Sequence, residues 1–338
     1  CDAGREGELI FKHVYDLSGS KKPVKRLWIS SLEDSAILDG MQHLRSAEEY
    51  RYLAEAAVCR SQADWLVGMN ATRAYTTKYF KKLTVGRVQT PTLAMLVERA
   101  GQISNFQKEK YFNVELDCDG IPAVKPKIFD PDEAEQLRSR CQGSEAIVTA
   151  VKETEKKVKA PKLYDLTTLQ REANRIYGMT AKQTLDTAQS LYEKKLITYP
   201  RTDSQYLTED MEQTARNVVR QIYEKYQLTG PFDQPEQPDV KKVMNNSKVT
   251  DHHAIIPTME LASCHLDELK SWEEKILFLI AVHTVMAMSK DHIYQETEIE
   301  VECQEEIFKA KGKIVLQDGW KLFENCFKNK DRMAIVDP

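Results

Sequence analysis

The sequence predicts a multidomain protein that combines helical domains with an antiparallel β region. Apolar residues recur mostly at helical spacing between Leu38 and Arg99. Alternating apolar and polar residues with turn signals begin after Phe106 and return after Tyr294. Helical patterns occupy the residues between these two alternating stretches. At 338 residues, with 41% hydrophobic and 30% charged residues, the chain is long enough for two or more folded domains.

The first hundred residues are predicted to be mainly helical. Residues 5–18 form a helix after a turn, and KKPVKRLWISS gives a short strand and a loop. In VQTPTLAMLVERA, Thr90 can cap a helix that starts at Pro91, because proline's missing amide hydrogen is no loss at the first helical position. One face of this helix would carry Leu93, Leu96, Val97 and Ala100.

Strand patterns come next. YFNVELDCDG, PAVKPKIFD and EAIVTAVKETEKKVK alternate and turn as a mostly antiparallel sheet does, with a short helix predicted from Pro131 to Cys141. The late stretch YQETEIEVECQEEIFKAKGKIVLQDGW alternates in the same way. The pattern indicates one β domain in two pieces, with a helical insertion between them.

The insertion begins with a helix, turn, helix pattern. Two capping boxes and a glycine suited to a left-handed helix end predict helices over residues 167–176 and 181–194. A short strand, LITY, follows, then a long loop rich in proline and asparagine, and further helices over residues 266–288. The capping residues are Thr167 with Gln170 and Thr180 with Gln183, and the glycine is Gly178.

One stretch of the sequence is rich in basic and aromatic residues, although the net charge of the chain is −4. A negative net charge argues against a protein that coats nucleic acid indiscriminately, but it permits a local nucleic-acid-binding groove. Residues 71–87, ATRAYTTKYFKKLTVGR, carry five basic and three aromatic residues and no acid. Cations hold phosphates and flat rings stack on bases, so this composition suits a nucleic-acid single strand. A solvated helix face with its aromatic rings in the core is an equal alternative.

Cysteine spacing and hydropathy limit the class of protein further. The seven cysteines stand far apart, without a CxxC pair or a histidine spacing typical of a zinc site. We therefore expect reduced thiols and no zinc. No apolar run approaches the roughly 18 residues of a membrane span, and no leader pattern opens the sequence. The expectation is a cytoplasmic protein without a membrane partner.

Tyr199 and Arg201, in ITYPRTDS, are the first candidates for chemistry. Pro200 restricts Tyr199 to an extended backbone, so both side chains would point the same way from a strand. A guanidinium can hold a phosphate and stabilise an attacking phenolic oxygen, which matters because an ordinary phenol has a pKa of about 10. The alternative is a tyrosine that only packs at the end of a strand.

Three further motifs carry weaker signals. His252 and His253, in DHHAIIPT, could supply a general acid or a hydrogen bond to phosphate, or have no role. Asp2 and Glu6 flank a turn before a helix and could bind Mg²⁺ if a third acid arrives from elsewhere. GRVQTPT could bind a phosphate at a helix start through Arg87. The sequence contains no P-loop motif, so we expect no use of ATP.

Five blocks, in this order, resemble the type IA DNA topoisomerases, most of all the bacterial topoisomerase III group. They are DxxREGELI, ADWLVGMNATRA, VGRVQTPTLAMLVER, the long block from TTLQREANRIYG to LITYPRTDS, and HHAIIPT. The resemblance implies part of a toroidal fold and an enzyme that cuts one DNA strand, passes another through the gap and reseals the cut. Tyr199 would form a 5′-phosphotyrosine link, Arg201 would position the scissile phosphate and His252 would assist cleavage. Because the phosphodiester is exchanged, no ATP is needed; relaxation and decatenation both stay open.

The resemblance also implies a single-strand groove, with single-stranded DNA as the partner. The matching residues are Arg60, Asp64, Arg73, Arg87 and Gln89. A helicase is a further candidate partner, and the protein is expected to be a monomer. The expected location is the cytoplasm, at the bacterial nucleoid.

The first residues resemble the second acidic motif of a Toprim domain. Glu6 would then be catalytic and would bind Mg²⁺ together with Asp2. Family members commonly show DxDxE here, whereas Gly4 replaces the middle acid. The Toprim glutamate of an earlier strand is not in the sequence, which also stops before the second half of the helical domain. We expect a fragment with an incomplete metal site that cleaves DNA poorly or not at all.

The resemblance divides the chain into five segments. Residues 1–37 would be a remnant of Toprim domain I, 38–105 the first part of helical domain IV and 106–162 the first part of β domain II. Residues 163–290 would be helical domain III with the active-site tyrosine. Residues 291–338 would hold the return strands of domain II and the start of the return to domain IV.

Two rival functions come from other classes. A non-catalytic regulator could insert the helix, turn, helix unit into a DNA groove and would prefer a specific duplex sequence. Another Toprim enzyme, such as a primase, would leave ITYPRTDS and HHAIIPT unexplained.

Overall fold

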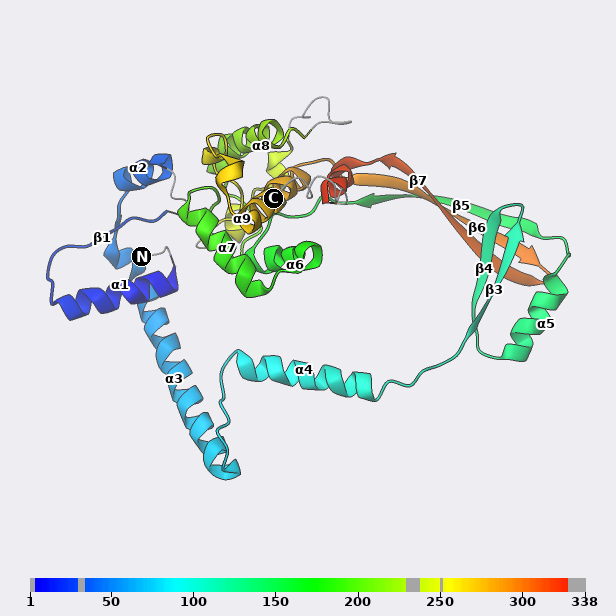
Figure 1. Ribbon diagram of the computed structural model, residues 1–338, viewed down its shortest axis with the longest axis horizontal. Coiled ribbons are helices and arrows are strands. Elements are labelled where there is room, and N and C mark those ends of the chain that lie inside the picture. The colour runs from blue at the N-terminus through cyan, green and yellow to red at the C-terminus, as the bar shows by residue number, and fades with distance from the viewer. Residues whose placement is uncertain (1–3, 30–33, 229–237, 250–251, 328–338) are drawn as a thin grey trace. The chain divides into compact units, whose positions relative to one another are not determined.

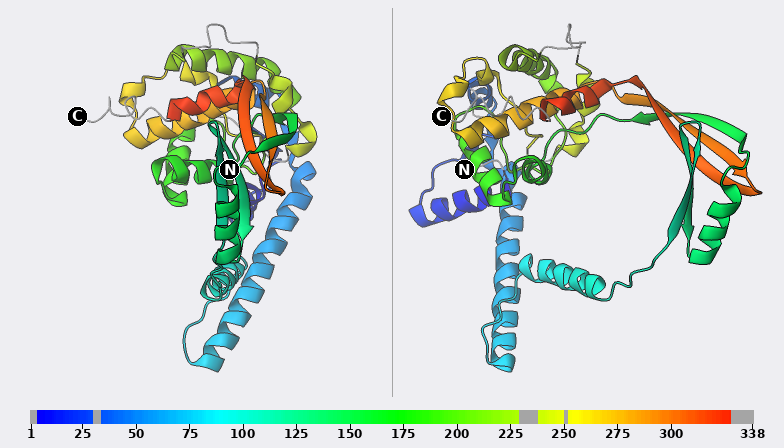
Figure 2. Two further views of the ribbon diagram at one scale, coloured as in Figure 1. Left: turned by 90° about the vertical axis from the view of Figure 1, so that its right-hand side faces the viewer. Right: turned by 45° about the vertical axis from the view of Figure 1, so that its right-hand side comes forward.

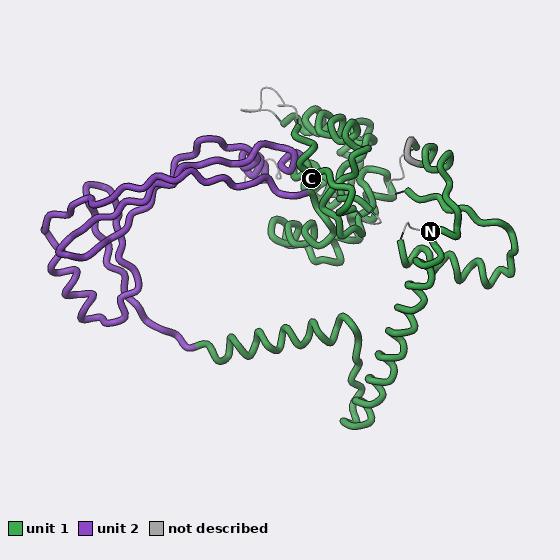
Figure 3. Tube along the Cα trace, turned by 180° about the vertical axis from the view of Figure 1, so that it is seen from behind, with its two compact units in different colours: residues 1–106, 163–284 green, residues 107–162, 285–338 purple. Residues whose placement is uncertain are grey.

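The computed structural model describes residues 4–29, 34–228, 238–249 and 252–327. The chain divides into two compact units, coloured separately in Figure 3. Unit 1 comprises residues 1–106 and 163–284, and unit 2 comprises residues 107–162 and 285–338. No helix of the described residues is long and apolar enough to cross a membrane.

The N-terminal part of unit 1 pairs two short strands between helices. Helix α1 (Arg5–Ser18) has the bounds predicted from the sequence, and β1 (Lys25–Arg26) pairs antiparallel with β2 (Arg45–Ser46) after α2 (Asp34–Gln42). A buried ion pair, in which Arg26 Nε lies 2.8 Å from Glu8 Oε2, links β1 to α1. Separating the two side chains would leave an uncompensated buried charge. The ion pair therefore fixes the position of β1 against α1.

Helices α3 (Arg51–Tyr79) and α4 (Gln89–Ser104) expose most of their residues to solvent (Figure 1). Helix α3 buries only Ala57 among its described residues and α4 buries none. The expected cap at Thr90 is wrong: α4 already begins at Gln89, and the Thr90 hydroxyl accepts a hydrogen bond from the Gly86 amide from inside the helix. Pro91 is consequently the third helical residue. The predicted apolar face, Leu93 with Leu96 and Val97, is exposed.

The second part of unit 1 is a helical cluster around α9 (Ser271–Ala287). It contains α6 (Leu166–Tyr177), α7 (Ala181–Glu193) and α8 (Glu212–Tyr226). Four consecutive residues of α9, 279–282, are all fully buried, which is why its sequence is apolar on every side.

The helix, turn, helix prediction is confirmed in outline and corrected at one cap. The Thr180 and Gln183 capping box is present, and Gly178 ends α6 with a φ of 69° in the left-handed region. The cap of α6 is Asp165 with Thr168, not Thr167 with Gln170. A carboxylate is among the best N-cap acceptors, so α6 starts one residue earlier than predicted.

Unit 2 is built on a five-stranded antiparallel sheet with the strand order β3-β4-β7-β6-β5. Its strands are β3 (Phe112–Cys118), β4 (Ile121–Ile128), β5 (Ile147–Val158), β6 (His292–Cys303) and β7 (Glu306–Gln317). Because β6 pairs with both β5 and β7, strands from both ends of the helical cluster share one sheet. Figure 2 shows β6 and β7 running side by side along their length.

Helix α5 (Pro131–Cys141), which has the predicted bounds, packs beside β3 and gives unit 2 its core (Figure 1). Leu137 and Cys141 of this helix are buried in one cluster with Val301 and Phe308 of the sheet. Away from this core the sheet carries ion pairs between β6 and its two neighbouring strands, and opposite charges on facing strands stabilise an antiparallel pair. The pairs are Lys156 with Glu296, Lys309 with Glu300, and Lys311 with Glu298.

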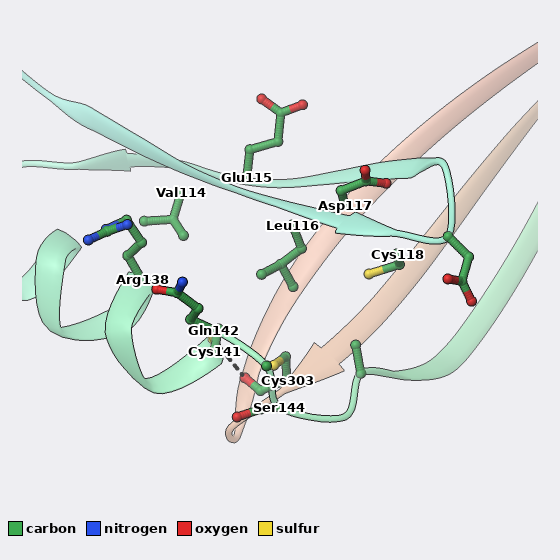
Figure 4. Close-up of a pocket in the computed structure, with 13 residues that line it drawn as sticks. Val114, Glu115, Leu116, Asp117, Cys118, Arg138, Cys141, Gln142, Ser144 and Cys303 are labelled. Atoms are coloured by element: carbon green, nitrogen blue, oxygen red, sulfur yellow. Dashed lines mark hydrogen bonds between the residues drawn. The ribbon is translucent and has the colours of Figure 1, made fainter.

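A pocket of about 570 Å³ in unit 2 brings three thiols together, as Figure 4 shows. Cys118, Cys141 and Cys303 line it, and the Cys141 thiol donates a hydrogen bond to the Cys303 carbonyl oxygen at 3.8 Å. Burial raises the pKa of the Cys141 thiol to about 11 and also raises the pKa of Cys118. The thiols of Cys118 and Cys141 are therefore protonated and poorly reactive. Cys141 and Cys303 are buried in the core of unit 2 as small packing groups.

Candidate active site

The segment that carries Tyr199 leaves α7 through a tight helix end. Lys195 adopts the left-handed conformation with a φ of 63°, and the Leu196 amide donates back to the Leu191 carbonyl oxygen at 2.9 Å. The next residues run antiparallel to residues 254–258. The Thr198 amide donates to the Ile256 carbonyl oxygen, and the Thr258 amide donates to the Leu196 carbonyl oxygen, both at 3.0 Å.

The expected strand through Tyr199 and Arg201 is wrong in extent. Only Ile197 makes a β bridge, with Pro257, and the residues after it form bends. Pro200 has no amide hydrogen to continue a ladder, which explains why the pairing ends here. Tyr199 is buried whereas Arg201 is exposed, so the two side chains do not share one environment.

The rings of Tyr199 and His252 are in contact. Their centroids lie 4.3 Å apart with planes inclined by 41°, and Tyr192 of α7 also contacts Tyr199, edge-on, with centroids 5.3 Å apart. Tyr199 and His252 are each 8% exposed. The structure thus brings together two predicted site residues that lie far apart in the sequence.

The adjacent histidine has a different environment. His253 is fully enclosed, its Nδ1 lies 2.9 Å from the Ala254 carbonyl oxygen, and burial lowers its pKa. A neutral ring that donates Nδ1–H to a carbonyl is a structural group. Of the two histidines that the sequence left open, His252 is the one beside the tyrosine.

Arg201 and His252 share a pocket of about 400 Å³ with the N-terminus of α6. Its other polar walls come from Asp165, Thr202 and Asp203. The Asp165 carboxylate caps α6 through the Thr168 amide and also accepts from Gln205. A guanidinium and an imidazole therefore border one cavity in which a phosphate group could sit, and Asp165 holds the start of α6 beside it.

The C-terminal end of α7, just before the tyrosine segment, is anchored by a buried carboxylate. Glu273, which is 2% exposed, accepts hydrogen bonds from the Ser190 hydroxyl at 2.7 Å, Lys194 Nζ at 2.6 Å and the Lys270 amide at 3.0 Å. Burial alone would raise the pKa of this carboxyl, but the three donors outweigh burial and hold the pKa below its ordinary value. Glu273 therefore remains ionised and fixes α7 to the start of α9.

Glu6 lies on α1, and the predicted groove residues lie on α3, in the turn before α4 and at the first residue of α4. Four of these six residues form two ion pairs. Glu6 pairs with Arg60 at 3.0 Å, and Asp64 pairs with Arg87 at 2.8 Å. The other two, Arg73 and Gln89, are exposed, and Arg73 makes no ion pair with any residue that the structure describes. A paired arginine must exchange its partner for a phosphate, whereas Arg73 is available as it stands.

The described residues do not fit a magnesium site. Asp2 lies outside them, and the Glu6 carboxylate faces the Arg60 guanidinium. No group of three potential metal-ligating side chains occurs within the described part of the chain. An acid that is paired with a guanidinium and lacks neighbouring acids is a poor ligand for a hard divalent cation.

Two residues beside Tyr199 were missed by sequence reasoning. Thr198 and Thr202 are buried, and their hydroxyls donate to backbone carbonyls of the His252 segment. Their buried environment follows from long-range pairing, which no local pattern reveals. The only available signal was their position next to Tyr199 and Arg201 in ITYPRTDS.

Comparison with known proteins identifies the family. The sequence model of the DNA topoisomerase family matches residues 48–336. The chain belongs to the DNA topoisomerase family. The resemblance seen in five sequence blocks is confirmed, and the family is the type IA group of these enzymes.

The topoisomerase relatives cover almost the whole chain. It is 42% identical to DNA topoisomerase 3 of Bacillus subtilis strain 168 over 98% of this chain and 46% of that protein. It is 41% identical to DNA topoisomerase 3 of Staphylococcus epidermidis over 96% of this chain and 46% of that protein. The chain therefore spans about half the length of these curated topoisomerases.

A solved topoisomerase structure supports the fold. Full-length topoisomerase I from Thermotoga maritima matches with a TM-score of 0.75 and 25% identity, over 96% of this chain and 54% of that chain. The predicted combination of helical domains and an antiparallel β region, as part of a type IA topoisomerase fold, is confirmed.

Proposed function

We propose that this chain carries the strand-cleavage centre of a type IA topoisomerase, with Tyr199 as the nucleophile. The contact between the Tyr199 and His252 rings at 4.3 Å, beside a pocket bordered by Arg201, is the observation that supports this most. The parent protein would cut one DNA strand, pass another through the gap and reseal the cut. Relaxation and decatenation both follow from this chemistry.

The proposed step is an exchange of one ester for another at phosphorus. The phenolic oxygen of Tyr199 forms a bond to the scissile phosphorus, and the bond from phosphorus to the 3′ oxygen breaks. The phenol loses its proton, and the departing 3′ oxygen gains one as the free 3′ hydroxyl. Religation reverses each change. Because one phosphodiester replaces another, the step needs no ATP.

Arg201 and His252 have separate roles in this proposal. Arg201, which is exposed at the pocket, would hold the phosphate and offset the charge that builds on its oxygens. His252, which packs on the tyrosine ring, would donate a hydrogen bond to the same phosphate. The Tyr199 ring is only 8% exposed, so DNA would reach the hydroxyl after the side chains around it part.

The groove proposal rests on exposed charge and exposed rings. Tyr75 and Tyr79 stack with their centroids 6.0 Å apart, both rings are about half exposed, and Lys78 lies 5.8 Å from the Tyr79 centroid. Cations with accessible rings suit a single strand, in which both phosphates and bases are open to contact. We therefore propose that Arg60, Asp64, Arg73, Arg87 and Gln89 contact single-stranded DNA.

The wider expectations also remain proposals. Type IA topoisomerases are generally Mg²⁺-dependent and ATP-independent, so Mg²⁺ is proposed as the cofactor of the full-length protein. Asp2 and Glu6 would be among its ligands only once Glu6 leaves its ion pair with Arg60 and further acids join the site. The division into domains at residues 37, 105, 162 and 290, a monomeric state, a nucleoid location and a helicase partner are proposed likewise. Since Gly4 stands where the family commonly has an acid, we propose that the 338 residues alone cleave DNA poorly.

The regulator alternative is not favoured. It would require only the pair α6 and α7, whereas the family match extends over residues 48–336. A sequence-specific regulator would also prefer duplex DNA, so a preference for a single strand separates the two.

Substitution of the nucleophile tests the proposal. In a full-length topoisomerase that contains this sequence, Tyr199→Phe removes one oxygen and keeps the ring that contacts Tyr192 and His252. We expect no covalent adduct with single-stranded DNA, no relaxation, and unchanged single-strand binding. Tyr192→Phe is the matched control and should still form the adduct. An adduct that persists in Tyr199→Phe would rule out the assignment.

A further inference from the structure

Two buried threonine hydroxyls flank the stretch that carries Tyr199 and Arg201. Thr198 precedes the tyrosine and is 3% exposed, and Thr202 follows the arginine and is 6% exposed. Each hydroxyl both donates and accepts a hydrogen bond inside the protein. Thr198 does not line the pocket beside Arg201, and Thr202, which does line it, has its hydroxyl engaged in these internal hydrogen bonds.

The hydroxyls join the tyrosine stretch to the backbone of the histidine segment. Thr198 Oγ1 donates to the Ala254 carbonyl oxygen at 3.0 Å and accepts from the Ile256 amide at 3.1 Å. Thr202 Oγ1 donates to the carbonyl oxygen of His252 itself at 3.0 Å and accepts from the Ser204 amide at 3.1 Å. One cross-link therefore lies on each side of Tyr199.

The chemistry of threonine suits this task. Its branched Cβ restricts χ1, so a hydroxyl held at both of its hydrogen-bonding sites has little freedom to move. Around Pro200 the backbone cannot extend a ladder because proline lacks an amide hydrogen. Side-chain hydroxyls can supply the missing connections at the point where a regular strand pair stops.

We propose that Thr198 and Thr202 are positioning residues that set the separation of the Tyr199 ring from the His252 ring. This rests on the proposed function, in which both rings meet one phosphate. A reacting group misplaced by about 1 Å can lose about 100-fold in rate, so loss of either cross-link slows cleavage by displacing Tyr199 or His252. Thr198 is the cleaner of the two positions, because it does not line the pocket. The threonines act through the geometry of Tyr199 and His252.

Near-isosteric substitutions test the proposal in the full-length protein. Thr198→Val and Thr202→Val remove each hydroxyl and keep the branched shape, and Thr198→Ser and Thr202→Ser keep the hydroxyl. Thr284→Val is the matched control, because Thr284 is 1% exposed and its hydroxyl bonds only to the Ile280 carbonyl oxygen of its own helix among the described contacts. Single-turnover cleavage of a single-stranded oligonucleotide and its binding are measured well below each melting temperature.

We expect each valine variant to cleave about 10- to 100-fold more slowly while its DNA binding stays within about 3-fold of the wild type. The serine variants should recover most of the rate, and Thr284→Val should cleave like the wild type. A valine variant that cleaves at the wild-type rate, or a loss that serine does not restore, overturns the proposal. If a valine variant does not fold, the alanine variant at that position is measured against the same two outcomes.

The threonine variants and Tyr199→Phe together distinguish failure of the positioning role from failure of the nucleophile assignment. If Tyr199→Phe still forms the adduct, the nucleophile is wrong, whatever the threonine variants do. If Tyr199→Phe abolishes the adduct while both valine variants cleave normally, the cleavage centre stands and the positioning role falls.

Discussion

The Tyr199 segment and the α3–α4 region both hold predicted site residues, but the two differ in how firmly the described structure encloses them. Tyr199 and His252 are each 8% exposed and packed ring against ring. Arg73 and Gln89 are exposed on helices that bury almost nothing, and Arg87 is exposed in the turn between them. The Tyr199 segment is held by buried packing contacts, whereas the α3–α4 region presents charged and aromatic side chains to the solvent.

The difference follows from what each region has to do. Attack of one oxygen on phosphorus requires a fixed distance and direction, which buried hydrogen bonds from both threonines can supply. Binding a DNA backbone requires several accessible cations, and exposed arginines can adjust to a flexible strand. We infer that substitutions in the Tyr199 segment act on rate and stability, whereas substitutions on α3 act on binding.

Glu273, the buried carboxylate that anchors α7, should contribute measurably to the free energy of unfolding. Glu273→Gln keeps the size of the side chain and removes the charge that Lys194 pairs with. Because Lys194 is 41% exposed and keeps part of its hydration, we expect a loss of about 1–2 kcal/mol in the free energy of unfolding at pH 7. Urea unfolding of the full-length protein, followed by circular dichroism, measures it.

The same substitution predicts a pH dependence. The pKa of Glu273 is lowered in the folded protein, so its contribution is full above the ordinary value near 4.5 and is lost as pH falls through the folded-state pKa. The stability difference between wild type and Glu273→Gln should therefore shrink as the pH falls below about 4.5. Glu135→Gln, in an exposed pair with Arg138, is the control and should change stability far less at pH 7. Equal losses of stability in Glu273→Gln and Glu135→Gln would show that the buried anchor contributes no more than an exposed ion pair.

A smaller effect is expected on α3 and concerns binding alone. Arg73→Ala should weaken binding of a single-stranded oligonucleotide and make the slope of log K against log salt shallower by about 0.7 for one lost phosphate contact. Arg51→Ala is the matched control on the same helix, because Arg51 pairs with Glu48 and Glu55. A salt titration of binding by fluorescence anisotropy measures both. Equal changes in slope would show that α3 has no localised groove.

Helix ends and capping boxes could be predicted from the sequence because they depend only on residues a few positions apart. The bounds of α1 and α5 and the capping box at Thr180 required only neighbours in the sequence. The cap at Thr90 failed because a second donor, the Gly86 amide, competed for its hydroxyl inside the helix. The strand through Tyr199 was predicted too long because proline ends the ladder there.

The site could be predicted as a set of residues but not as a geometry. The family motifs pointed to Tyr199, Arg201 and His252, and the structure brings the first and last into contact. Nothing local indicates that Thr202 reaches the His252 carbonyl oxygen, because that bond joins segments far apart in the sequence. Glu273 was missed for the same reason, since its partners lie on another helix.

The most direct test of the central claim is to locate the covalent bond. The full-length protein is incubated with single-stranded DNA, denatured during cleavage, digested with nuclease and protease, and analysed by mass spectrometry for a peptide that retains a nucleotide. The account predicts a 5′-linked nucleotide on Tyr199, in the peptide that contains Pro200. A nucleotide on any other residue, with Tyr199 unmodified, would contradict it.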